Sequence, residues 1–271
     1  MKCPVTYITF YGMTDTGLRR PHNEDHFVVV DLTQKVFAVR DNTALLHSLS
    51  QHVGRHGTLL AVADGVGGYA GGELASQIAV EAMAEALWSL VDADPAATSP
   101  LGKAMEEAHD SIRQAAERQT QYPNMASTLT ALHITADGRL IVGQIGDSRA
   151  YLWRDRQLIA LTEDQTMVQF LQKNGLLSEP EIARYPYRHI ILQALGQDHP
   201  VQPDVRTYSC QDGDRLLLCT DGLSSYVHPG RIEAIMAQAD DEYTTCQALI
   251  QEANAHGGPD NITVLVASLE V

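Results

Sequence analysis

Apolar residues recur at helical spacing in two long segments of the first half of the chain. Over residues 73–90 they repeat every three or four positions, and Glu81 and Glu85 fall on the opposite side. The second segment starts near Pro100, a residue suited to the first turn of a helix, and keeps the same spacing over residues 100–115. The pattern predicts two amphipathic helices in succession.

Beyond these helices the apolar residues form short runs that are rich in β-branched side chains. Such runs predict strands, and Asp137-Gly138 between two of them is a typical hairpin-turn dipeptide. The predicted strands cover residues 127–135, 139–145, 148–153, 215–219 and 262–269. Helical spacing returns at residues 165–173, 231–237 and 243–255.

Strands that follow one another without regular alternation with helices are typical of an α+β fold with antiparallel sheet. Two packed sheets flanked by helices fit this order. No repeat, low-complexity tract or linker divides the chain, so residues 1–271 are predicted to form a single domain. Residues 31–57 mix short apolar pieces with polar ones, and we expect a hairpin or loop insertion there.

The composition narrows the classes of partner. The chain has 19 Lys and Arg against 34 Asp and Glu, and its formal charge of -15 disfavours binding to nucleic acid. No stretch approaches about 18 uninterrupted apolar residues, and the start lacks a basic and apolar leader. We therefore expect a cytoplasmic protein without a membrane span. The four cysteines include no Cys-x-x-Cys pair, which argues against a zinc knuckle.

Aspartates stand beside glycines at the ends of several apolar runs. Asp64, Asp147 and Asp221 each close such a run, and Asp260 comes just before one. Strand ends hold side chains at fixed points of a sheet edge, so these carboxylates can converge, but their repulsion then requires cations. An all-oxygen site suits magnesium or manganese, and Gly65 lets a backbone carbonyl approach the metal. For each aspartate alone, an ordinary Asp-Gly turn remains the alternative.

A second cluster of chemically active residues lies between Gly17 and Asp25. Arg20 could grip a phosphate through two parallel hydrogen bonds, and Glu24 and Asp25 could support metal-bound waters. For this segment alone, a solvated charged loop is an equal alternative.

Together these stretches resemble the metal-dependent serine/threonine protein phosphatases of the type 2C class, in particular the compact bacterial members. The matching stretches, in the order of that family, are Thr16-Gly17-Leu18 with Arg20 and Asn23-Glu24-Asp25, Ala63-Asp64-Gly65-Val66-Gly67-Gly68, Gly72-Glu73-Leu74-Ala75-Ser76, Ser127-Thr128-Leu129, Gly146-Asp147-Ser148-Arg149-Ala150-Tyr151, Leu161-Thr162-Glu163-Asp164, Thr220-Asp221-Gly222-Leu223 and Gly258-Pro259-Asp260-Asn261-Ile262-Thr263. Each stretch is weak by itself, whereas the ordered series over residues 16–266 is specific.

The resemblance implies a four-layer α-β-β-α sandwich with a binuclear manganese or magnesium centre in a cleft at one end. In this resemblance Asp64 is expected to bridge both cations, the carbonyl of Gly65 to contact one of them, and Asp221 and Asp260 to hold the other. Glu24 is expected to act through water, with Asp25 on the same acidic rim. Asp147 is expected at a third, weaker metal, and Arg20 on the substrate phosphate. A water bridging two cations becomes a nucleophile near neutral pH, so no covalent phosphoenzyme is required. The substrates implied are proteins phosphorylated on serine or threonine by a kinase, and the enzyme is expected to be a monomer.

Four further features concern the resemblance. Residues 174–190, and Gly175 to Ala183 in particular, fall where bacterial members carry a mobile flap. Tyr69 stands where relatives often have histidine, Ser225 where many have aspartate, and Gln193 where arginine is frequent. Tyr69 therefore bears on protonation of the leaving group, Ser225 on the third metal site and Gln193 on contacts with the substrate.

Two other classes remain as alternatives. The first is a catalytically silent phosphoprotein-binding module on the same fold, although such a module has no chemical need for three clustered carboxylates. The second is a phosphatase with an aspartyl nucleophile, which needs Asp-x-Asp at the end of an early strand. No predicted early strand ends in that motif.

Overall fold

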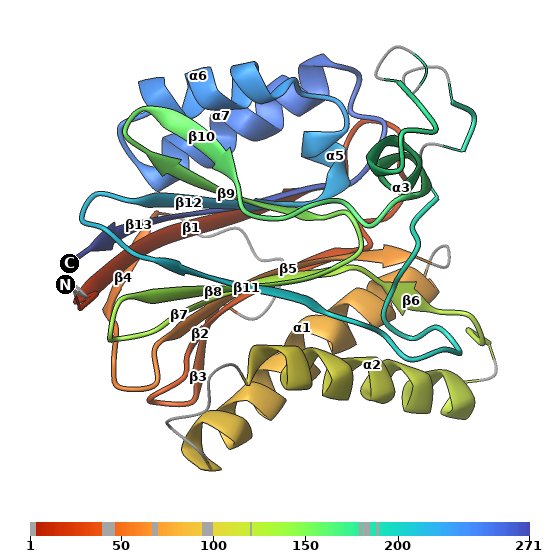
Figure 1. Cartoon of the computed structure of the whole chain (residues 1–271), viewed down its shortest axis with the longest axis horizontal. Coiled ribbons are helices and arrows are strands. Elements are labelled where there is room, and N and C mark those ends of the chain that lie inside the picture. The colour runs from red at the N-terminus through yellow and green to blue at the C-terminus, as the bar shows by residue number, and fades with distance from the viewer. Residues whose placement is uncertain are drawn as a thin grey trace.

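The computed structural model describes residues 4–39, 47–66, 70–93, 100–119, 121–178, 181, 185–187 and 190–271. Two antiparallel sheets stack face to face, and helices cover the outer face of each sheet (Figure 1). Apolar side chains from both inner faces fill the space between the sheets. The layer order is α-β-β-α, which confirms the predicted α+β sandwich.

The first sheet has six strands. They are β1 (Tyr7–Asp15), β4 (Leu49–His52), β9 (Arg149–Arg154), β10 (Gln157–Ala160), β12 (Arg215–Cys219) and β13 (Ile262–Glu270). Their order across the sheet is β10-β9-β12-β13-β1-β4, so β13 lies inside the sheet between β12 and β1. Its first residues are all buried, which explains why this run is almost continuously apolar rather than alternating.

The second sheet has seven strands. They are β2 (Asp25–Asp31), β3 (Val36–Val39), β5 (Thr58–Val66), β6 (Ala126–Ser127), β7 (Leu129–Ile134), β8 (Arg139–Ile145) and β11 (Asp204–Ser209). The order is β11-β8-β7-β5-β2-β3, and β6 pairs with β5. Within residues 31–57, β3 forms a hairpin with β2 and β4 pairs with β1, so this segment gives an edge strand to each sheet.

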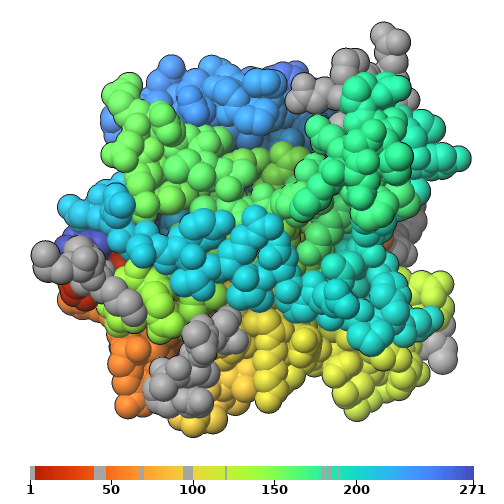
Figure 2. All heavy atoms as spheres, in the orientation of Figure 1, coloured from red at the N-terminus to blue at the C-terminus, as the bar shows by residue number. Residues whose placement is uncertain are grey.

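Helices α1 (Ala70–Ala93) and α2 (Leu101–Arg118) pack on the seven-stranded sheet. Helices α6 (Pro229–Gln238) and α7 (Glu242–Ala255) cover the six-stranded sheet, while α3 (Met167–Lys173) and α5 (Asp221–Ser224) lie at one end of the sandwich (Figure 1). The space-filling view shows the α6–α7 layer (blue) and the α1–α2 layer (yellow) at opposite edges of the molecule (Figure 2).

Among the described residues, α1 is the one helix that is long and apolar enough to cross a membrane by length and composition. In this structure its apolar side chains belong to the core: Val80, Met83 and Leu87 are fully buried against the sheet and α2. Small residues such as Ala75 and Ala79 line the same face and allow close packing. The hydropathy of α1 is therefore explained by its central place in the outer layer.

The predicted elements lie where the apolar pattern put them. The strands at 139–145 and 215–219 have the predicted bounds, and the other predicted helices and strands shift by a few residues at most. Strands β1, β2, β10 and β11 were not predicted. The last two are largely exposed, so they carry little apolar alternation.

Candidate metal centre

The antiparallel pairing of β2 and β5 places two carboxylates side by side. Asp25 is the first residue of β2 and lies directly opposite Asp64 near the end of β5. Because neighbouring strands run in opposite directions, the start of one and the end of the other share a sheet edge. Gly65 follows at the same edge and donates its N–H to the carbonyl of Glu24 at 3.1 Å.

The second sheet supplies two more carboxylates by the same geometry. Asp221 follows β12 and Asp260 precedes β13, its antiparallel neighbour. A backbone hydrogen bond of 3.1 Å from Thr220 to Thr263 continues the ladder to this edge. The two sheet edges meet at the end of the sandwich where α5 lies (Figure 1).

A cavity of about 390 Å³ lies between these edges. It is lined by Arg20, Glu24, Asp64, Gly65, Val66, Ile191, Asp221, Tyr226, Asp260 and Asn261. Six of the eight predicted site residues therefore border one cavity, although they come from distant parts of the chain. Asp25 and Asp147 are not among the lining residues.

Close backbone contacts explain the glycines of this end. Gly17 has a positive φ of 75°, and a Cβ there would lie 2.1 Å from the carbonyl oxygen of Asp260. A Cβ at Gly65 would lie 2.1 Å from the carbonyl oxygen of Gly72, in the first turn of α1. Any side chain at either position would push the loop away from the carboxylates.

Asn261 ties the loop that carries Arg20 and Glu24 to the start of β13. Its Nδ2 donates to the carbonyls of Thr16 and His22 at 3.0 and 2.9 Å. Its Oδ1 accepts the N–H of Glu24 at 2.8 Å. Asn261 therefore positions the whole loop, a role that the residue type alone does not reveal.

Arg20 lies at the rim of the cavity. Its Nη2 donates to Oδ2 of Asp260 at 2.8 Å, and the two side chains are 49% and 22% exposed. Burial alone would lower the pKa of Arg20, but the hydrogen bond to Asp260 raises it, so the charge is retained. Arg19 is exposed and does not line the cavity. The structure thus places Arg20, and not Arg19, beside the carboxylates. This is the residue to which the sequence register assigned the phosphate contact.

Asp25 lies behind the cavity as a fully buried support. Its Oδ2 accepts hydrogen bonds from the hydroxyls of Thr220 and Thr263, both at 2.8 Å. Burial raises the pKa of Asp25 to about 7 in spite of these two bonds. Asp25 therefore joins the two sheets directly beneath the cluster.

Hydroxyl groups also hold the backbone of Asp64. The N–H of Asp64 donates to Oγ1 of Thr128 at 2.9 Å, and Ser127 donates to the Asp64 carbonyl at 3.0 Å. Thr128 in turn shares a hydrogen bond of 2.8 Å with Ser148. Sequence reasoning missed these supports, because Ser and Thr within strands read as ordinary strand residues. Their presence in the matched stretches was the only signal.

Asp147 stands in the turn between β8 and β9. Its carboxylate is buried, and burial followed by the charge of Asp221 raises its pKa to about 7. Arg149 does not compensate it fully, since its Nε and Nη2 donate to Asp164 at 2.7 and 2.6 Å. Asp147 therefore adds a further poorly compensated carboxyl next to the cluster.

The electrostatics of the cluster fit a site for cations. Burial and the neighbouring carboxylates raise the pKa of Asp64 well above its usual range, and burial and Asp260 raise that of Asp221 to about 6. Oδ1 of Asp221 and Oδ1 of Asp147 are shielded from solvent and have no hydrogen-bond partner within the described ranges. Carboxylate oxygens without donors are the ligands that hard divalent cations prefer.

The cluster is open rather than closed around one point. Among the residues that the structure describes, no three acidic, histidine or cysteine side chains are already gathered at the spacing of a single ion. Magnesium and manganese keep several water ligands and need few protein ligands each, so an open carboxylate site suits them. It does not suit zinc, whose structural sites are closed and tetrahedral.

The three departures from the expected pattern differ in what the structure says of them. Tyr69 lies outside the described residues. Ser225 caps the end of α5 and is exposed. Gln193 accepts the N–H of Gln202 at 2.8 Å and donates to its carbonyl at 3.3 Å, so it closes a loop.

A sandwich that gathers carboxylates around a recessed cavity, with an arginine at the rim, is the arrangement that a metal-dependent phosphoric-ester hydrolase requires. Comparison with known families gives the particular family. The profile described as Protein phosphatase 2C matches residues 44–250, and the chain belongs to this family.

Individual relatives agree with this assignment. Serine/threonine phosphatase stp of Listeria monocytogenes is 33% identical over 262 residues, which cover 95% of this chain and 94% of the relative. The solved structure of the serine/threonine phosphatase PstP/Ppp of Mycobacterium tuberculosis is 34% identical, covers 98% of this chain and 100% of that one, and has a TM-score of 0.78. A PstP catalytic domain in complex with two manganese ions is 33% identical with a TM-score of 0.76, again covering 98% and 100%. The predicted family and enzyme class are confirmed.

Proposed function

We propose that this chain hydrolyses phosphoserine and phosphothreonine in other proteins, with Asp64, Gly65, Asp221 and Asp260 holding two divalent cations. The observation that carries the proposal is the convergence of these residues on one cavity that has Arg20 at its rim. Bound there, manganese or magnesium supplies an activated water and offsets the negative charge of the phosphate.

The protein's own groups bind and orient the substrate. Arg20 carries a permanent charge and can turn its guanidinium from Asp260 to a phosphate that enters the cavity. Val66, Ile191 and Tyr226 form the less polar part of the wall and can contact the residues next to the phosphorylated side chain.

The remaining acidic residues have supporting roles in this proposal. Glu24 lines the cavity and acts through water, while Asp25 fixes the two sheet edges through Thr220 and Thr263. Asp147, whose Oδ1 receives no hydrogen bond from the part of the chain that the structure describes, is suited to hold a third and weaker cation. Residues 174–190 stay a predicted flap, of which Glu179 and others lie outside the described residues.

The test is a manganese-dependent assay on p-nitrophenyl phosphate and on a phosphothreonine peptide. We expect turnover of both substrates, loss of turnover with chelator and recovery on adding manganese or magnesium. Turnover by fully demetallated protein would contradict the proposed chemistry. A silent binding module on the same fold would bind the peptide and leave it intact.

We further propose a bacterial cytoplasmic setting, in which a serine/threonine kinase produces the substrates and the phosphatase acts as a monomer. Support comes from the bacterial relatives, which are named as serine/threonine phosphatases. Cell fractionation, and mass measurement of the purified chain, test the location and the oligomeric state.

A further inference from the structure

A groove of about 270 Å³ lies beside the cavity of the metal centre. It is lined by Glu163, Asp164, Gln165, Thr166, Gln169, Phe170, Lys173, Leu192, Gln193, Asp204 and Arg206. Ile191 lines the metal cavity, and its neighbour in the chain, Leu192, lines the groove. Because successive side chains of an extended segment point to opposite sides, residues 190–192 form a ridge between the two. A polypeptide whose phosphorylated residue occupies the metal cavity can therefore cross this ridge into the groove.

Hydrogen bonds fix the ridge and the groove relative to the carboxylate cluster. The N–H of Leu192 donates to the carbonyl of Gln165 at 2.7 Å, and Ile191 forms an antiparallel bridge with Thr166. The side chain of Gln165 accepts the N–H of Gly146 at 2.9 Å, in the turn between β8 and β9. The groove is therefore attached to the same end of the sandwich that carries the metal centre.

Apolar side chains lie uncovered in this groove. None of the seven residues of α3, all of which the structure describes, is buried. Phe170 on α3 is 53% exposed, and Leu192 on the ridge is 36% exposed. Both line the groove, and exposed apolar surface with a polar rim is typical of an interaction site. Together they provide a contact for an apolar side chain of a partner.

The charged side chains of the groove pair with partners of opposite charge. Nζ of Lys173 donates to both carboxylate oxygens of Glu163 at 3.1 Å. Nη2 of Arg206 donates to Asp204 at 2.6 Å. The remaining carboxylate, Asp164, is held by the arginine at the start of β9. Because these charges compensate one another, selection by the groove depends on its apolar pair.

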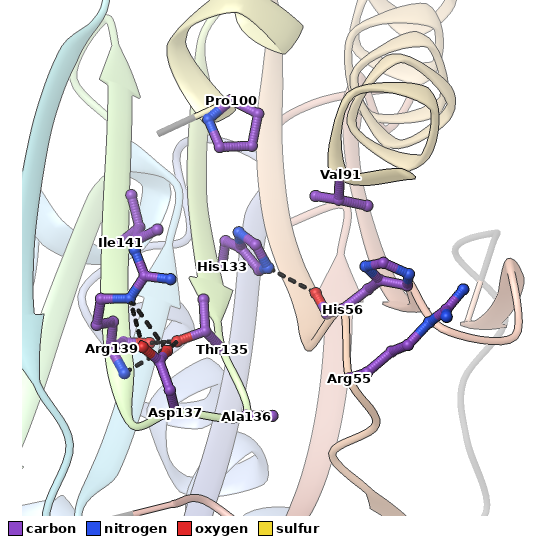
Figure 3. Close-up of a pocket in the computed structure, with 10 residues that line it drawn as sticks. All are labelled: Arg55, His56, Val91, Pro100, His133, Thr135, Ala136, Asp137, Arg139 and Ile141. Carbon is purple, nitrogen blue, oxygen red and sulfur yellow. Dashed lines mark hydrogen bonds and ion pairs between the residues drawn. The ribbon is translucent and has the colours of Figure 1, made fainter. Parts of the chain in front are cut away.

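A larger cavity, of about 590 Å³, does not adjoin the metal centre in this way (Figure 3). It lies at the start of β8, and the length of that strand separates it from the metal end. Its polar groups are engaged with one another: His133 donates to the carbonyl of His56 at 2.8 Å, and Arg139 donates to Asp137 at 3.0 Å (Figure 3). The groove beside the ridge is therefore the better candidate for contact with a substrate.

We propose that the groove binds the substrate polypeptide next to its phosphorylated residue, with an apolar side chain of the substrate against Phe170 and Leu192. The inference rests on the proposed function, since the phosphoserine or phosphothreonine must occupy the metal cavity. Crossing one layer of extended chain takes about 10 Å, and an extended peptide advances about 3.3 Å per residue. The apolar residue is therefore expected about three positions from the phosphorylated one.

The test compares two phosphothreonine peptides that differ only at the third residue on each side, which is leucine in one peptide and serine in the other. For the wild-type chain we expect kcat/KM to be about fivefold higher for the leucine peptide, mainly through KM, because apolar surface is buried. Phe170→Ala should remove most of this preference and leave turnover of p-nitrophenyl phosphate unchanged. Phe170→Leu, which keeps an apolar side chain, should retain the preference.

Val36→Ala is the matched control. Val36 is also 53% exposed, but it lies on β3 opposite Asp31, at the end of β2 away from Asp25, so the preference should persist. Equal kcat/KM for the two peptides in the wild-type chain overturns the inference and leaves the proposed function intact. An equal loss of p-nitrophenyl phosphate turnover in Phe170→Ala overturns it too.

Two further outcomes are distinct from these. If the wild-type chain hydrolyses neither peptide nor p-nitrophenyl phosphate, the proposed function fails and the inference fails with it. If the wild-type chain elutes as a dimer that Phe170→Ala converts to a monomer, the groove is a contact between copies of this chain, which overturns the inference.

Discussion

Asp214 and Asp147 are both buried carboxylates, yet the structure compensates them differently. Asp214, 1% exposed, accepts hydrogen bonds from Nε and Nη2 of Arg154 at 2.7 and 2.6 Å. Asp147 lies near Arg149, but that arginine donates to Asp164 instead. The fold can evidently supply an arginine to a buried carboxylate. At the metal end Arg20 pairs with Asp260 at the rim, but no arginine of the described residues donates to Asp64, Asp147 or Asp221, and the compensation of these carboxylates is left to external cations.

The same contrast applies to the carboxylates that line the catalytic cavity. The charges that raise the pKa of Asp64 come from other aspartates, namely Asp25, Asp221, Asp147 and Asp260. Among the described residues that line this cavity, Arg20 alone carries a positive charge, and it belongs to the rim. A cluster with this balance is unfavourable without metal and becomes favourable with it.

The largest effect that this comparison predicts is on turnover. Asp64→Ala and Asp221→Ala should each lower kcat by about 10³-fold or more, because each removes a ligand and the electrostatic stabilisation that depends on it. Turnover of the phosphothreonine peptide at limiting manganese is the measurement. Asp204→Asn, which alters an exposed ion pair with Arg206, is the control and should retain activity. Near-normal turnover in both cavity variants would remove the basis for the site.

The free energy of unfolding should respond in opposite ways to substitution of Asp214 and of Asp64. Asp214→Asn should lower the free energy of unfolding by about 3 kcal/mol, because it removes the charged partner of Arg154 and leaves that guanidinium only the Ser209 carbonyl. Asp64→Asn should leave the metal-free protein equally stable or more stable, because it removes a repelled charge. Urea unfolding of both variants in chelator measures the difference. If Asp64→Asn destabilised metal-free protein as much as Asp214→Asn, the carboxylates would be compensated after all.

The pH dependence of the free energy of unfolding, measured on the metal-free protein, tests the same contrast. The pKa of Asp147 rises from a usual value of 3.8 to about 7 on folding. Its protonated form therefore stabilises the fold fully below about pH 3.8, and this contribution is lost as the pH rises through about 7. Between pH 5 and 8 the wild-type chain should lose on the order of 2 kcal/mol more than Asp147→Asn. His133, whose pKa is lowered to about 4, acts in the opposite direction in both proteins and cancels in the difference.

Equal pH profiles for the wild-type chain and Asp147→Asn would show that this carboxyl is already compensated without metal. Unfolding in urea at a series of pH values, always with chelator, provides the profiles. Adding manganese should flatten the difference, because cation binding favours the ionised carboxylate.

Arg20 and Arg19 give the smallest and most selective comparison. Arg20→Ala should lower kcat/KM roughly 30-fold, because one charge-assisted phosphate contact is lost. This factor corresponds to about 2 kcal/mol of binding free energy in the transition state. Manganese affinity should change little. Arg19→Ala should have much less effect, since Arg19 is exposed outside the cavity. A larger effect of Arg19→Ala would mean that the phosphate register is wrong by one residue.

Much of the fold could be predicted from the sequence, because buried elements leave a strong periodic pattern. The strands β8 and β12 are buried and carry apolar runs, and both were predicted with their bounds. Strand β10 was not predicted, because it is largely exposed and therefore carries no apolar run. Strand β2 was not predicted, because the charged residues that lead into it are typical of a loop, although Asp25 is its first residue.

The candidate site was predictable as a set of residues but not as a network. Aspartates at strand ends are visible in the sequence, and antiparallel pairing brings them together. The supports are not visible, because their roles depend on contacts between distant segments. Asn261 reaches back to the loop near Glu24, and Thr220 and Thr263 converge on Asp25. Such bonds follow from sheet stacking, which no local pattern encodes.

The most direct test of the account is calorimetric titration of the chelator-treated protein with manganese. The wild-type chain should bind two ions at the carboxylate cluster, and the temperature of unfolding should rise with manganese concentration. Asp64→Ala should lose this binding, whereas Asp204→Asn should keep it. If Asp64→Ala binds manganese with the stoichiometry and affinity of the wild-type chain, the cluster is not the metal centre.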